Sequence, residues 1–103
     1  MFGIIYEYIE AATGVSAYVG KAQSYHSMTL AIRDVQRRHK HIKHAVPFDA
    51  VLRANPKGFK FRVLHEIARD TGHALQEDMQ ALERIEVRQR SPRYNCVRFT
   101  CYG

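Results

Sequence analysis

The sequence predicts an α/β fold in which a small, mainly antiparallel three-stranded sheet is flanked by helices. Segments at residues 2–10, 17–20 and 59–64 have the alternation or β-forming composition of strands. Two longer segments, at 28–39 and 70–89, repeat apolar residues with the period of a helix. A chain of 103 residues can bury one modest core, so we expect a single domain spanning residues 1–103.

The first two strands are predicted to form a hairpin. Residues 2–10 are rich in β-forming side chains, and their alternation places Tyr6 and Tyr8 on the same face. The Thr-Gly pair at 13–14 is typical of a turn. The stretch AYVG at 17–20 is therefore interpreted as the returning strand, which the glycine ends.

Two helices are predicted next. The first covers residues 28–39, with Ser27 as its cap. Its apolar stripe consists of Met28, Ala31, Ile32 and Val35. A shorter helix begins at Pro47, which a first helical turn tolerates, and ends at the Asn-Pro pair at 55–56. Its apolar stripe consists of Phe48, Val51 and Leu52.

The second half of the chain predicts a strand, a long helix and an extended tail. Residues 59–64 alternate apolar and basic side chains, the pattern of a strand with one buried face. The triplet at 70–72 can begin a helix that runs to about Gln89, before Pro92. Its apolar stripe consists of Leu75, Met79, Leu82 and Ile85. Residues 94–101 are suited to a last extended segment.

The composition favours a polyanionic partner. Sixteen lysine and arginine residues against ten acidic residues give a net charge of +6, and such a charge favours nucleic acid through counterion release. The charge gathers in two clusters. The first contains Arg33, Arg37, Arg38, Lys40 and Lys43 together with His39, His41 and His44. The second contains Arg84, Arg88, Arg90, Arg93 and Arg98.

The cysteines and the apolar segments bear on the compartment. Two cysteines without a secretory leader argue against a disulfide scaffold, so we interpret Cys96 and Cys101 as structural thiols in a reducing cytoplasm. No segment approaches the roughly 18 apolar residues that cross a bilayer. We therefore expect a soluble protein without a membrane partner.

Two motifs lie far apart in the chain. The hairpin carries IIY at 4–6 and YVG at 18–20, with eleven residues between the two tyrosines. Eleven residues also separate Glu83 from the last residue of PRYN at 92–95. With these motifs the sequence resembles the GIY-YIG nuclease family. One departure is Ile4, which stands where the family usually has glycine, unless Gly3 fills that role.

The likeness extends over nearly the whole chain. YVGKA at 18–22 and the spacing from Glu83 to Asn95 are similar to the N-terminal nuclease domain of the bacterial excision-repair incision subunit. FKFRVLHEI at 59–67 resembles the third strand of phage and intron-encoded members. The resemblance implies the GIY-YIG nuclease fold, with an active site over the sheet between the hairpin, the first helix and the long helix.

The resemblance also implies a chemistry, the metal-dependent hydrolysis of nucleic-acid phosphodiester bonds. Tyr6 or Tyr18 would position or deprotonate the attacking water. Glu83 would bind one divalent cation, Mg²⁺ or Mn²⁺, whose other ligands are water and phosphate oxygens. Asn95 would hold the site together through side-chain hydrogen bonds, or orient Tyr6 or a water.

A tyrosine with a pKa of about 10 is a poor base at neutral pH. We therefore expect positive charge near it, from Lys21 or Arg33, to lower its pKa.

An arginine of the first helix would steady the phosphate, and two assignments stay open. Arg33 has Leu30 three residues before it, as an apolar residue often stands in the family. Arg37 has His41 one turn after it, where many members carry histidine or tyrosine.

We expect the basic segment to hold the phosphate backbone through Arg37, Arg38, His39, Lys40 and Lys43. A metal site in HKHIKH at 39–44 is the weaker interpretation, because no acid or cysteine accompanies the histidines. DNA is the expected substrate and RNA an alternative. A homodimer or a separate protein could supply specificity.

Two other functions compete with the nuclease. One is a non-catalytic nucleic-acid-binding module that retains the nuclease fold, motivated by Ile4 and by the two possible arginines. The other is a structural or inhibitory interaction protein in which the tyrosines are core residues.

Overall fold

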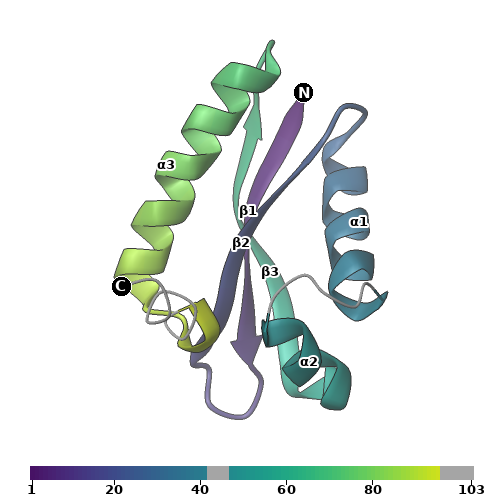
Figure 1. Cartoon of the computed structure of the whole chain (residues 1–103), viewed down its shortest axis with the longest axis vertical. Coiled ribbons are helices and arrows are strands. Elements are labelled where there is room, and N and C mark those ends of the chain that lie inside the picture. The colour runs from purple at the N-terminus through teal and green to yellow at the C-terminus, as the bar shows by residue number, and fades with distance from the viewer. Residues whose placement is uncertain (42–46, 96–103) are drawn as a thin grey trace.

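The computed structural model describes residues 1–41 and 47–95, and three strands in it form one antiparallel sheet (Figure 1). The strands are β1 (Phe2–Glu10), β2 (Ser16–Ser24) and β3 (Phe59–Ala68). β1 lies in the centre, between β2 and β3. The predicted α/β class, an antiparallel three-stranded sheet with flanking helices, is confirmed.

Helices cover both faces of this sheet. They are α1 (Met28–His41), α2 (Pro47–Ala54), the 3-10 turn η1 (Pro56–Gly58) and α3 (Gly72–Arg90). α1 and α2 lie on one face and α3 on the other (Figure 1). We call the first the α1 face, to which β1 contributes Ile4, Tyr6 and Tyr8, and the second the α3 face, to which β1 contributes Gly3, Ile5 and Glu7. Within the described residues, no helix is both long and apolar enough to span a membrane.

β1 and β2 form the predicted hairpin, in which Tyr8 pairs with Tyr18 and Tyr6 with Gly20. The loop between them uses Gly14 at a φ of +74°, which glycine adopts without the steric penalty of a Cβ. β2 does not end at Gly20 as predicted. Gly20 lacks the positive φ that would turn the chain, so the strand continues to Ser24.

β3 also runs past its predicted end at Leu64, because a bulge changes its alternation. Ile5 pairs with His65 and Tyr6 with Val63, which leaves Leu64 as the extra residue. Val63 packs on the α1 face, whereas Leu64 packs on the α3 face. A pattern of strict alternation therefore stops at the bulge, although the pairing with β1 continues to Ala68.

The helix ends follow local side-chain chemistry. The Ser27 hydroxyl accepts a hydrogen bond from the Leu30 N–H at 3.1 Å, and Thr71 accepts one from the Ala74 N–H at 3.2 Å. α3 ends at Ser91, whose φ of 45° is left-handed. Residues 93–95 form a helical turn instead of the start of the predicted extended tail, and 96–101 lie outside the described residues.

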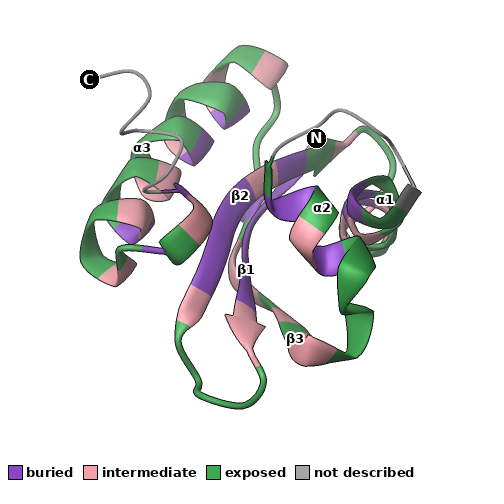
Figure 2. Cartoon of the chain, turned by 60° about the horizontal axis from the view of Figure 1, so that its bottom comes forward, coloured by how far each residue is buried: buried purple, intermediate pink, exposed green. Residues whose placement is uncertain are grey.

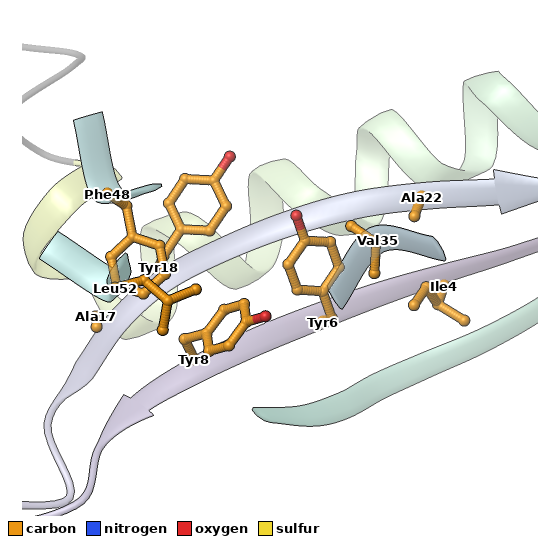
Figure 3. Packing of buried hydrophobic residues seen from close by; sticks show 9 residues of the cluster. All are labelled: Ile4, Tyr6, Tyr8, Ala17, Tyr18, Ala22, Val35, Phe48 and Leu52. Carbon is orange, nitrogen blue, oxygen red and sulfur yellow. The ribbon is translucent and has the colours of Figure 1, made fainter. Parts of the chain in front are cut away.

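Each face has its own buried core, visible along the centres of β1 and β2 (Figure 2). The α3-face core is aliphatic and consists of Ile5, Val19, Ile67, Leu75 and Met79. The α1-face core is largely aromatic and consists of Ile4, Tyr6, Tyr8, Ala17, Tyr18, Ala22, Val35, Phe48 and Leu52 (Figure 3). The three tyrosines of the hairpin therefore lie under α1 and α2.

Candidate functional site

Tyr6 and Tyr18 project from neighbouring strands to the same face of the sheet (Figure 3). Their ring centroids are 6.2 Å apart. Gly20 makes this arrangement possible, because a Cβ at that position would lie 2.5 Å from the Tyr6 hydroxyl oxygen. The glycine of the YVG motif thus lets the Tyr6 ring lie across β2.

The Tyr6 hydroxyl belongs to a buried chain of three polar side chains. It lies 2.5 Å from Nε2 of His39, on α1, and Nδ1 of the same imidazole is hydrogen-bonded to Oδ1 of Asp49, on α2. Asp49 is 1% exposed, Tyr6 2% and His39 3%. We call this chain the Tyr6–His39–Asp49 chain. Because it is sealed from bulk water, its polar atoms depend on one another for hydrogen bonding.

Burial fixes the protonation states in this chain. It raises the pKa of Tyr6 well above its ordinary value, with a further increase from Tyr18, so the phenol is neutral at pH 7. Burial also lowers the pKa of His39, although Asp49 opposes that effect, so the imidazole is neutral too. The Tyr6 O–H therefore donates to Nε2 of His39. Nδ1–H of His39 donates to the Asp49 carboxylate.

The expectation that Lys21 or Arg33 lowers the tyrosine pKa is wrong for Tyr6. Lys21 pairs with Ile5 and so lies on the α3 face of β2, opposite the tyrosines. The basic side chain that acts on both Tyr6 and His39 is Arg38, whose charge lowers both pKa values. Burial outweighs its effect on Tyr6.

Tyr8 adds a second sealed hydroxyl to this face. Its ring makes edge contacts with Tyr6 and His39, at centroid distances of 6.2 and 5.5 Å. Burial raises its pKa to about 12, with a smaller contribution from the charge of Asp49. The hydroxyl has no hydrogen-bond partner among the residues that the structure describes.

Asn95 closes the free edge of β2 between Tyr18 and Gly20. Its Oδ1 accepts a hydrogen bond from the Val19 N–H at 2.8 Å, and its Nδ2 donates to the Val19 carbonyl at 3.0 Å. The side-chain amide thus pairs with β2 as a neighbouring strand would. Tyr94 is held beside it by a ring contact of 5.4 Å with Phe48. Both of these bonds of Asn95 go to the backbone of Val19, and neither goes to Tyr6.

The cations of α1 lie on its outer surface. Arg33, Arg37, Arg38 and Lys40 are all exposed. In the part of the chain that the structure describes, none of the four forms an ion pair. They are therefore free to meet phosphate groups from solvent. The side chain of His41 and the whole of Lys43, also predicted for the site, lie outside the described residues.

Glu83 lies on α3, half-buried beside Leu82 of the α3-face core. The tyrosine side chains thus lie on the α1 face of the sheet, whereas Glu83 belongs to the helix that covers the opposite face (Figure 1). Within residues 1–41 and 47–95, no three histidine, cysteine or acidic side chains gather closely enough to hold a metal together. A single carboxylate remains suited to Mg²⁺, which keeps several water ligands.

The sequence did not predict the roles of His39 and Asp49 in the Tyr6–His39–Asp49 chain. His39 was assigned to phosphate contact, but it is buried and cannot take that role. The apolar stripe of α1 contained the signal, because Ala31, Val35 and His39 are spaced by four residues and share one face. Asp49 carried no such signal. Its neighbour Phe48 marked the helix as apolar, and the carboxylate is buried because His39 lies against it.

Comparisons with known proteins add no family to this picture. The sequence matches no protein-family model, no curated protein and no solved structure.

Proposed function

We propose that this protein is a metal-dependent endonuclease that hydrolyses phosphodiester bonds in DNA, with RNA as the alternative substrate. The observation that carries the proposal is the side-by-side placement of Tyr6 and Tyr18 over Gly20, under a helix whose outer surface carries exposed cations that form no ion pair with any described residue. Hydrolysis needs an ordered water and neutralisation of the phosphoryl oxygens. The tyrosines and the cations of α1 are suited to these two tasks.

The roles divide between the two sides of the β2 edge. Tyr6 and Tyr18 position or deprotonate the water. Asn95 holds in place Val19, which lies on β2 between Tyr18 and Gly20. An arginine of α1 steadies the phosphate, with Arg38 joining Arg33 and Arg37 as a candidate because its charge acts on Tyr6. Glu83 would hold the divalent cation, which would neutralise phosphate charge when bound.

Nicking of a supercoiled plasmid in the presence of Mg²⁺ or Mn²⁺ tests the proposal. Replacing Glu83 with glutamine removes the proposed metal ligand, and we expect at least a roughly 10²-fold loss of rate, corresponding to about 3 kcal/mol of transition-state stabilisation. Glu77→Gln is the matched control on the same helix, because Glu77 is exposed. Equal cleavage by wild type and Glu83→Gln would contradict the proposal.

The second candidate function is a nucleic-acid-binding module without catalysis. One observation favours it: the Tyr6 hydroxyl is almost completely buried, whereas a water-activating group must meet the substrate water. Such a module binds DNA with a steep salt dependence but leaves the plasmid intact under every divalent metal. Substituting Lys40 with glutamate should weaken binding in either case. Cleavage separates the two functions.

A further inference from the structure

We propose that Tyr6 is a proton conduit, which passes a proton from the attacking water to His39, and that Asp49 is the positioning residue that orients His39. This assignment rests on the proposed nuclease function. It adds His39 and Asp49 to the reacting machinery, and it defines what Tyr6 does during the reaction.

The geometry has the three parts of an activated acid–base unit. The group that the proposal places against the attacking water is the Tyr6 hydroxyl. Its acceptor is Nε2 of His39 at 2.5 Å, and the orienting group is the Asp49 carboxylate on Nδ1. The three come from β1, α1 and α2. All three are at least 97% buried, since their exposed fractions are 2%, 3% and 1%.

The proton movement can be written completely. As the water oxygen forms its bond to phosphorus, the water proton passes to the Tyr6 oxygen, and the Tyr6 hydroxyl proton passes to Nε2 of His39. The phosphorus–oxygen bond to the departing alkoxide breaks, and solvent supplies the proton of the new alcohol. The imidazolium, stabilised by Asp49, then returns its proton to solvent along the same path.

This route removes a difficulty in using tyrosine as a base. Burial raises the pKa of Tyr6, so a free phenolate would be rare at neutral pH. We call this transfer of a proton from the water through Tyr6 to His39 the relay. In the relay, Tyr6 is neutral before and after the transfer, and the phenolate is never required. The proton acceptor is His39, whose lowered pKa keeps Nε2 unprotonated at pH 7.

The groups around the relay come from every element that packs on it. Tyr8 of β1 and Tyr18 of β2 raise the pKa of Tyr6, Arg38 of α1 lowers the pKa of both Tyr6 and His39, and Asp49 of α2 raises both. β3 contributes the apolar ring of Phe61, stacked on Tyr6 at 5.4 Å. Protonation of His39 below its lowered pKa removes the acceptor and stops the relay.

The molecule contains a matched control on its other face. His65 of β3 also pairs with an acid, Glu86, at 3.1 Å, but its side chain is 36% exposed and has no tyrosine on its other nitrogen in the described part of the chain. A substitution at His65 therefore repeats the chemical change made at His39 without touching the relay.

The first experiment compares plasmid cleavage by wild type, His39→Gln and His65→Gln across pH 5 to 8. We expect His39→Gln to lose about 10²–10⁴-fold in rate, the usual contribution of a general base. Wild type and His65→Gln should both show an acid limb, on which the rate falls as His39 becomes protonated. Equal rates for His39→Gln and wild type would overturn the relay and leave the nuclease proposal in place.

The second experiment does not require cleavage. Nitrogen-15 NMR of histidine-labelled wild type at pH 7.5 should find Nδ1 of His39 protonated and Nε2 unprotonated. Asp49→Asn, which keeps the side-chain shape, should shift this tautomer and lower any cleavage rate. Asp78→Asn, at a partly exposed position of α3, should change neither. An Nε2-protonated His39 in wild type would overturn the relay. If the wild type has the expected tautomer but cuts nothing, the nuclease function is overturned. The catalytic role of the Tyr6–His39–Asp49 chain is then overturned as well.

Discussion

Each face of the sheet carries a histidine–acid pair, fully buried on the α1 face and partly exposed on the α3 face, and the two pairs are completed by different side chains. On the α3 face, His65 and Glu86 are joined by Arg90, which bonds Glu86 at 2.6 Å and reaches the buried Glu7 at 3.3 Å. Arg62 bonds Glu7 at 2.7 Å as well. Every carboxylate in this network faces an arginine, so the network is neutralised and structural.

On the α1 face, the pair of His39 and Asp49 is completed by a neutral hydroxyl. Nε2 of His39 accepts a hydrogen bond from the Tyr6 hydroxyl. The Tyr8 hydroxyl beside it has no partner in the described part of the chain. The four cations of α1, namely Arg33, Arg37, Arg38 and Lys40, lie outside the core and form no ion pair within residues 1–41 and 47–95. The α3 face thus pairs its charges with one another, whereas the described cations of α1 stay exposed to solvent.

The largest test of this comparison removes one core side chain from each face. Phe48 and Leu75 are both 0% exposed, so Phe48→Ala should lower the free energy of unfolding by about 3–5 kcal/mol and Leu75→Ala by about 2–5 kcal/mol. Phe48 stacks on Tyr18 with an interplanar angle of 2° and also contacts His39, so its removal should disturb the His39 tautomer. Leu75→Ala should leave that NMR signal unchanged.

Urea unfolding measures the two free energies, and the tautomer measurement is made on the folded fraction. If Leu75→Ala disturbed His39 as strongly as Phe48→Ala, the two faces would be coupled through the sheet. The separation of structural and functional faces would then be wrong.

Most of the fold could be predicted because it follows from local periodicity. Alternation in β1 placed Tyr6 and Tyr8 on one face, and the four-residue spacing in α1 identified its buried stripe. The same alternation places Lys21, three residues after Tyr18, on the opposite face, but the family resemblance assigned both to one site. The pairing of His39 with Asp49 depends on how α2 packs on α1, and residue spacing does not encode that contact.

A middle-sized effect is expected from adding one methyl group at either of two glycines that lie against a neighbouring side chain. At Gly20, a Cβ would lie 2.5 Å from the Tyr6 hydroxyl oxygen, which His39 holds in place, so Gly20→Ala should cost about 1–3 kcal/mol. At Gly3, a Cβ would lie 2.4 Å from the Met79 sulfur. Methionine is flexible and can move aside, so Gly3→Ala should cost about 1 kcal/mol.

Thermal unfolding compares these two variants, and the tautomer of His39 again reports on the α1 face. Gly20→Ala should alter it and Gly3→Ala should not. A greater loss of stability in Gly3→Ala than in Gly20→Ala would show that the α3 face is the more rigidly packed of the two.

The smallest expected effect is a difference between the faces in their response to acid. The pKa of His39 is lowered in the folded protein, so the unfolded chain binds the proton first, near pH 6.5. The contribution of neutral His39 to stability is therefore complete above pH 6.5 and decreases as the pH falls toward the folded pKa. The pKa of Glu86 is lowered chiefly by its bond with Arg90, so its contribution decreases only as the pH falls below about 4.5.

Urea unfolding of wild type between pH 8 and 4 should accordingly show two pH ranges in which the free energy of unfolding falls. The first range comes from His39 on the α1 face and the second from Glu86 on the α3 face. His39→Gln should flatten the slope below pH 6.5 while keeping the loss below pH 4.5, and Glu86→Gln should do the reverse. Because both variants keep a polar side chain at the site, a change in slope reports the titrating group and not a lost volume. A slope below pH 6.5 that survived in His39→Gln would mean that another group on the α1 face takes up the proton, and His39 could not then be the acceptor that the relay requires.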